Sequence, residues 1–199
     1  MPGTLAPAAP AAAAARDAHN RTLNAAGESF WGLLNGLIAS STVLVVLLRQ
    51  YGASTMMIGA ITAIEIASTL APQILGSALF ASRARRQRRL IVWHLAAILP
   101  FLLVIAAIAL MGPRWPPAAV RWGVLAAYAC FMFGIGVVLA VWFDWLSGVF
   151  PQATRGRAFG LGFGASAVLN FAGGLVAGRL LAAADRIPSF SILYTVAAF

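Results

Sequence analysis

Long apolar runs separated by short polar segments are the dominant pattern of this chain. Five runs cover residues 29–48, 57–80, 90–111, 119–143 and 158–181, and a sixth begins near residue 189 and is still apolar at Phe199. Each of the first five has the roughly 20 residues that an α-helix needs to cross the hydrocarbon core of a membrane. None alternates apolar and polar residues at a period of two, as the strands of a membrane barrel would. The pattern therefore predicts an all-α polytopic membrane protein with six spans.

The two ends of the chain differ from the predicted spans. Residues 1–20 begin with an Ala/Pro-rich stretch and predict a disordered cytoplasmic tail, which leaves residues 21–199 as the transmembrane bundle. The sixth run, residues 189–199, would extend only about 16 Å as a helix, roughly half of the hydrocarbon core. We therefore expect the sixth helix to be truncated at Phe199 and the chain to be a fragment of a longer protein.

Composition supports the membrane assignment and indicates whether lipid or nucleic acid is the binding partner. Hydrophobic residues make up 61% of the chain and charged residues only 10%, whereas about 25% is usual in soluble proteins. The net charge of +9 comes from arginines that lie between the apolar runs, as in cytoplasmic loops, so we expect lipid and not nucleic acid as the partner. More of these arginines lie on the side of the N-terminus. The distribution predicts an integral protein of a bacterial inner membrane with a cytoplasmic N-terminus.

Glu65 and His94 are ionisable side chains inside the apolar runs. Glu65 lies in the second run, where a charge at the centre of a span costs about 2.5–3.5 kcal/mol. It is either a coupling carboxylate for a proton or cation or a substrate contact, or else a structural carboxylate bonded to a neighbouring helix. His94, near one end of the third run, is either an interfacial residue or a proton relay.

Uncharged polar residues give further candidates for a cavity. In the first run Asn35 and Thr42 share a seven-residue spacing with Glu28 and Arg49, which places the four near one helical face. This stripe predicts either the lining of a cavity or hydrogen bonds between helices. Asn170 in the fifth run has small residues on its face, which favours close packing over cavity lining.

Glycines at four-residue spacing predict close contact between helices. Gly160 and Gly164, and likewise Gly174 and Gly178, match the small-xxx-small pattern of membrane helix interfaces. The sequence shows no nucleophile–base pair, phosphate-binding loop or metal-ligand spacing. We therefore expect no enzymatic activity, no cofactor and no metal.

Two polar segments carry a resemblance to a known family. Residues 76–86, GSALFASRARR, match the glycine and the basic end of the pattern G-x-L-A-D-R-x-G-R-R, but Ser82 is the residue nearest to the aspartate and the second glycine is absent. The second segment has Asp144, then Pro151, then the sequence RGRAFG from Arg155. Together with the spacing of the runs, these segments resemble the N-terminal half of the major facilitator superfamily.

The resemblance implies a six-helix bundle that forms one half of a twelve-helix secondary active transporter. Such a protein moves a small solute by alternating access, with or without a coupled proton or cation, and its C-terminal half would follow this chain. A non-transporting relative that acts in assembly or sensing is one alternative, and a half-size protein that dimerises is another. The residues expected to line the substrate or coupling cavity are Asn35, Thr42, Glu65 and Asn170. The residues expected at the cytoplasmic gate are Gly76, Arg83, Arg86, Asp144, Arg155, Gly156 and Arg157.

Overall fold

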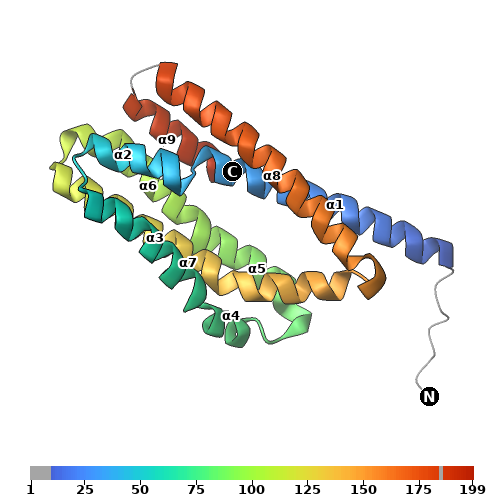
Figure 1. Ribbon diagram of the computed structural model, residues 1–199. Coiled ribbons are helices and arrows are strands. Elements are labelled where there is room, and N and C mark those ends of the chain that lie inside the picture. Colours follow the sequence, from blue (N-terminus) through green and yellow to red (C-terminus); the bar gives the residue numbers. More distant parts are fainter. Residues whose placement is uncertain (1–9, 184–185) are drawn as a thin grey trace.

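The computed structural model describes residues 10–183 and 186–199, and throughout these residues it contains helices and turns but no strand (Figure 1). Five helical stretches of this part are long and apolar enough to cross a membrane. They are Ala14–Gln50, Thr55–Leu79, Arg86–Arg114, Pro117–Val149 and Gln152–Ala182. The protein is therefore an all-α integral membrane protein, as the apolar runs predict.

The first span is a broken helix. It consists of α1 (Pro10–Leu37), the π-helical turn η1 (Ser40–Leu44) and α2 (Val45–Gln50). The helix α1 begins at Pro10, inside the segment 1–20 that the sequence predicts as a disordered tail, and residues 1–9 lie outside the described part. Alanine is the strongest helix former and proline is well tolerated in the first helical turn, so the Ala-rich stretch extends the helix.

The second and third spans are also irregular, each next to a proline. The second consists of α3 (Thr55–Leu70) and α4 (Gln73–Leu79), which are separated at Pro72. The third consists of α5 (Arg86–Trp93), the π-helical η3 (His94–Ile98), α6 (Leu99–Met111) and η4 (Gly112–Arg114), and the short η2 (Arg83–Arg85) precedes it. A proline lacks a backbone N–H and disturbs the preceding turn, which explains the interruption at Pro72 and the wide turn before Pro100.

The last three helices are α7 (Pro117–Val149), α8 (Gln152–Ala183) and α9 (Arg186–Ala197). The sequence predicts a polar loop from Asp144 to Arg157, but α7 and α8 extend into it from both sides. Leu146, Phe150 and Ala158 form a small buried cluster there, which holds the two helix ends together. The helix α9 is shorter than a membrane span, so a sixth spanning helix stays a prediction.

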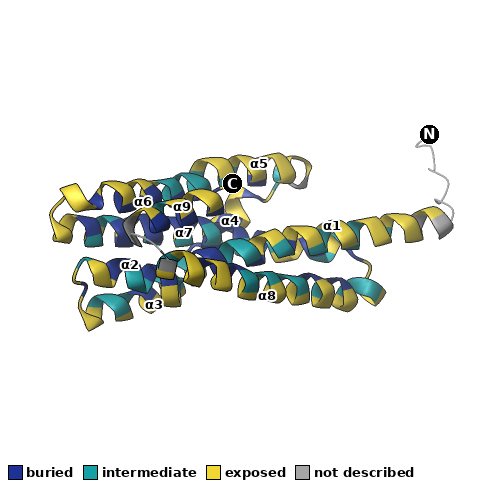
Figure 2. Ribbon diagram, turned by 90° about the horizontal axis from the view of Figure 1, so that it is seen from above, coloured by how far each residue is buried: buried dark blue, intermediate teal, exposed yellow. Residues whose placement is uncertain are grey.

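The helices pack in pairs, with α7 near the middle of the bundle (Figure 1). The pairs in contact are α1 with α8, α3 and α4 with α7, α6 with α7, α6 with α9, α8 with α9, and α1 with α9. Buried positions face the interior, whereas large apolar side chains such as Phe30, Ile74 and Phe171 are 69–78% exposed on the outside (Figure 2). These outward apolar faces are where lipid contacts an integral membrane protein.

Glycines bring α1 and α8 together, but most of them are not the glycines that the sequence pattern predicts. A Cβ atom added at Gly32 or Gly36 would overlap the backbone carbonyl of Ser166 or Asn170 on α8. No atom lies within 4 Å of a Cβ added at any of the predicted glycines. Those predicted glycines are Gly160, Gly164, Gly174 and Gly178. Gly174 nevertheless meets α1 through its backbone, because its N atom would lie 2.8 Å from a Cβ added at Gly36. The prediction is therefore wrong for Gly160, Gly164 and Gly178, which have open space where a Cβ would be.

Candidate functional site

The backbone of the first span leaves the helical conformation in the middle of its apolar run. After α1 ends at Leu37, Ala39 has φ −46° and ψ 123°, and the carbonyl of Ala39 accepts from the N–H groups of Thr42 and Leu44 at 3.2 and 3.3 Å. Non-helical backbone at this depth is tolerated only where protein or water surrounds it. The break therefore needs polar neighbours from other helices.

A carboxyl group and three hydroxyl groups gather near this break. The Tyr128 hydroxyl of α7 donates to Oε1 of Glu65 on α3 at 2.6 Å. The side chain of Ser40, the first residue after the break, lies near the same hydroxyl. Tyr194 of α9 is close enough to Tyr128 for an electrostatic interaction. We call these four residues, Ser40, Glu65, Tyr128 and Tyr194, the Glu65 cluster.

Glu65 has one neutral hydrogen-bond donor and no counter-ion in the Glu65 cluster. Glu65 is half-buried, and no described side chain forms an ion pair with it. Tyr128 is only 4% exposed and supplies one hydrogen bond, while the Tyr194 hydroxyl is buried with no partner. A carboxyl group in such surroundings can accept a cationic group.

The other predicted cavity residues do not join this cluster. Asn35 donates from Nδ2 to the Trp31 carbonyl of its own helix at 2.8 Å, and Thr42 is exposed beyond the break. The break separates these two residues, so the predicted stripe is not continuous. The side chain of Asn170 is exposed and its backbone carbonyl lies against Gly36, which fits the packing interpretation.

At the end of the bundle that carries the basic segment, two of the predicted gate residues meet. Arg86 of α5 donates to Asp144 of α7 at 2.6 Å, and its Nε donates to the Phe80 carbonyl at 3.2 Å. Arg89 donates to the Leu79 carbonyl at 2.8 Å. The two arginines thus satisfy carbonyls at the end of α4, and Arg86 also ties that end to α7.

The remaining predicted gate residues have other surroundings. Arg155 donates to the Ser147 carbonyl at 2.6 Å and so caps the end of α7, while Gly156 and Arg157 are exposed. Gly76 is buried, and a Cβ added there would overlap the Val137 carbonyl of α7. Arg83 lies in η2 and its side chain is outside the described part. Asp144 is therefore paired with Arg86 and not with Arg155.

The opposite end of the bundle is fixed by a different arginine. Arg121 of α7 donates to the Tyr51 carbonyl at 2.6 Å, in the turn where Gly52 has a left-handed φ of 76°. Burial raises the pKa of the Tyr51 hydroxyl, which has no partner and lies against Gly112. This contact holds the first and fourth spans together at that end.

Sequence reasoning misses Ser40, Tyr128 and Tyr194. The sequence does contain a feature that points to them, because a tyrosine or serine inside an apolar span needs a hydrogen-bond partner. The partners come from other helices, so the sequence does not show which residues they are.

No protein-family model, curated protein or solved structure matches the chain. The fold defines its class as an all-α integral membrane protein with five candidate membrane-spanning helices in the described residues.

Proposed function

We propose that the protein is a secondary active transporter of the major facilitator type that moves a small solute by alternating access. The observation that carries this proposal is the hydrogen bond between Glu65 and Tyr128 beside the break in the first span. An ionisable group inside the membrane is expensive and marks ion or substrate pathways, and interrupted helices are typical of transport sites. A structural role alone would need neither the break nor an uncompensated carboxyl group.

The pairing of the helices supports the same proposal. When the five spans are numbered in order and α9 is counted as the sixth helix, the contacts include the first with the fifth, the second with the fourth and the third with the sixth. Exchanging the first three helices for the last three leaves these three pairs unchanged. The third helix also contacts the fourth, and the sixth also contacts the first and the fifth. Two repeats of three helices have opposite orientations in the membrane, which is the nested repeat of facilitator bundles.

The charge distribution supports a gate and an orientation. The basic segment between α4 and α5, the turn between α7 and α8, and the start of α1 all lie at one end of the bundle (Figure 1). In the proposal this end faces the cytoplasm of a bacterial cell, and the Arg86–Asp144 pair closes that side. The Glu65 cluster then lies about halfway through the membrane, where solute or a coupled proton would bind against a second six-helix bundle.

Alternating access can be tested by measuring whether a cysteine at position 40 reacts with a reagent added on either side of the membrane. In a Cys130→Ser background, Ser40→Cys is treated with the impermeant cation 2-(trimethylammonium)ethyl methanethiosulfonate in right-side-out and inside-out membrane vesicles. We expect labelling in both preparations, because the site would open to each side in turn. Ile74→Cys is the control. Its parent side chain is 78% exposed on the apolar exterior, where a thiol has no water and should not react.

Protection in both preparations would contradict the proposal and favour a non-transporting role in assembly or sensing. Labelling from both sides together with ion leakage through the vesicles would instead indicate a pore, as the dimer alternative requires.

A further inference from the structure

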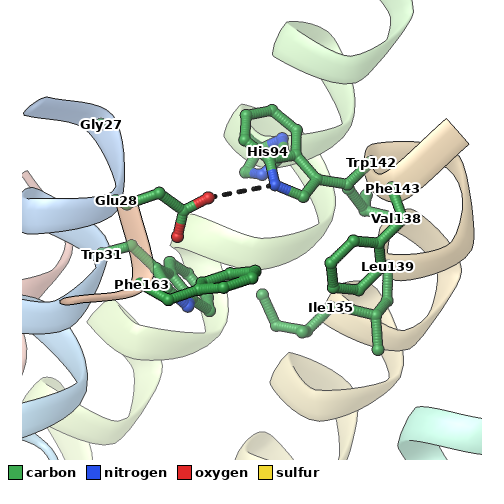
Figure 3. Close-up of a pocket in the computed structure, with 10 residues that line it drawn as sticks. All are labelled: Gly27, Glu28, Trp31, His94, Ile135, Val138, Leu139, Trp142, Phe143 and Phe163. Atoms are coloured by element: carbon green, nitrogen blue, oxygen red, sulfur yellow. Dashed lines mark hydrogen bonds between the residues drawn. The ribbon is translucent and has the colours of Figure 1, made fainter. Parts of the chain in front are cut away.

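A second acidic residue, separate from the Glu65 cluster, lies in a pocket at the basic end of the bundle. Glu28 of α1 is only 7% exposed and lines a pocket of about 260 Å³ between α1, η3, α7 and α8 (Figure 3). We call this cavity the Glu28 pocket. The position of Glu28 near the start of the first apolar run suggests an interfacial side chain, but the neighbouring helices bury it.

The carboxylate of Glu28 has little to neutralise it. Its Oε1 accepts one hydrogen bond from the Trp142 indole Nε1 at 3.3 Å, and no described side chain forms an ion pair with it. The nearest turns of α1 offer no free cation, because Arg21 is paired with Asp17. Moving a charge from water into the protein interior without a counter-ion is strongly unfavourable. A cationic ligand would supply the counter-ion that this site lacks.

The helix α8 closes tightly behind Glu28. A Cβ added at Gly162 would come within 2.6 Å of Asn24 Nδ2 and 3.1 Å of Glu28 Cγ. The glycine thus allows α8 to press the carboxylate towards Trp142 and the pocket, the direction in which Figure 3 shows it pointing.

Aromatic rings form much of the remaining wall. Trp31, Trp142, Phe143 and Phe163 line the pocket together with the aliphatic side chains of α7 (Figure 3). The face of an aromatic ring attracts a cation, and this attraction grows when water is excluded. A carboxylate among such rings is suited to a cation that also carries apolar groups.

His94 adds a polar ring to the wall of the pocket. Its Nδ1 lies 2.8 Å from the Leu90 carbonyl oxygen, which can only accept, so Nδ1 carries the proton. The other ring nitrogen, Nε2, forms no hydrogen bond with a described residue, and His94 lines the pocket. The lining residues include no arginine or lysine, so the pocket presents acceptors and ring faces and disfavours anions.

We propose that the Glu28 pocket binds a monovalent organic cation with a small apolar or aromatic body, with Glu28 as the counter-ion and tryptophan rings against the apolar groups. Inorganic cations such as Ca²⁺ need several oxygen ligands, and one carboxylate does not supply them. The volume is at the small end for ligand pockets, which limits the ligand to a compact molecule. That such a cation is also transported rests on the proposed function.

Benzyltrimethylammonium is a suitable probe because its charge does not change with pH. We expect saturable binding to the protein in lipid nanodiscs, measured by calorimetry and by quenching of tryptophan fluorescence. Benzyl alcohol, which has the same ring without the charge, should give no saturable binding. Glu28→Gln should weaken binding of the cation roughly tenfold or more. The matched control is the double variant Asp17→Asn with Arg21→Gln, which removes a carboxylate from the same helix outside the pocket without freeing Arg21, and it should leave the affinity unchanged.

Equal binding of the cation to wild type and Glu28→Gln, equal binding of the cation and the alcohol, or no saturable binding would each overturn the proposal. The comparison of the two ligands on wild-type protein does not depend on how well the variant folds. Uptake of labelled benzyltrimethylammonium into proteoliposomes then separates the two proposals. If binding depends on Glu28 but no uptake is observed, the result supports the proposed binding site and contradicts transport of this cation. If uptake is observed and Glu28→Gln has no effect on it, the result supports the proposed transport and contradicts the proposed binding site.

Discussion

At the scale of single residues, two buried tyrosines illustrate how hydrogen bonding determines whether a polar group inside a membrane stabilises or destabilises the protein. Tyr128 donates to Glu65 at 2.6 Å, whereas the hydroxyl of Tyr194 is buried without a partner. Losing a donor leaves a carboxyl group unsatisfied, and losing an unpaired hydroxyl removes a penalty. The same chemical change should therefore have opposite consequences at the two positions.

We predict that Tyr128→Phe destabilises the protein by about 1–3 kcal/mol, because Glu65 loses its donor. Tyr194→Phe should be neutral or stabilising. Thermal unfolding in detergent, followed by near-UV circular dichroism, measures both variants against wild type. An equal loss of stability in the two variants would show that packing of the rings, and not the hydrogen bond, matters at Tyr128.

At the scale of secondary-structure elements, the contact between α1 and α8 depends on glycines that allow the two backbones to touch. Gly36 faces the carbonyl of Asn170, while Gly178 on α8 has open space where a Cβ would be. The inward and outward glycines of this helix pair therefore differ in what surrounds them, although both are helical. In an apolar solvent such packing is a main source of helix association.

We predict that Gly36→Ala lowers the stability of the protein by about 1–3 kcal/mol, because the added methyl group forces α1 and α8 apart. Gly178→Ala is the control and should raise helix stability by up to about 1 kcal/mol, since alanine is the better helix former. The melting temperature of each purified variant tests this prediction. A similar melting temperature for both would mean that α1 and α8 are not in close contact.

At the scale of the whole molecule, contacts at the basic end connect parts of the bundle that are far apart in sequence. Arg86 and Asp144 join the start of the third span to the end of the fourth, and Thr154 donates to Asp17 at 3.3 Å between α8 and α1. The Asp144 side chain is 57% exposed, so its ion pair contributes at most about 1 kcal/mol to stability. In the transport cycle that we propose, a weak and accessible ion pair of this kind would open and close.

We predict that Asp144→Asn leaves the melting temperature nearly unchanged but increases labelling of Ser40→Cys from the side of the basic segment, because the closed state loses a contact. The exchange of the two charges, Arg86→Asp with Asp144→Arg, should restore the wild-type labelling rate. Unchanged labelling in the single variant would show that the pair has no part in gating.

Some of the candidate site can be predicted from the sequence. Glu65 is conspicuous because a carboxyl group is costly inside an apolar run, and Arg86 and Asp144 are conspicuous because polar segments with charges separate the spans. Their partners are not predictable in the same way. Glu65 meets Tyr128 across 63 positions of the chain, and Arg86 meets Asp144 across 58.

The sequence by itself determined that the described chain is helical and suited to the membrane, because only helices satisfy the backbone of long apolar runs in lipid. It also placed the five long spans close to their observed positions. Only the tertiary structure decided which face of each helix packs, which glycines touch a neighbour, where the first span breaks and which polar groups meet. The physical reason is that lipid and the protein interior are equally apolar, so hydropathy does not distinguish the face that contacts lipid from the face that contacts another helix.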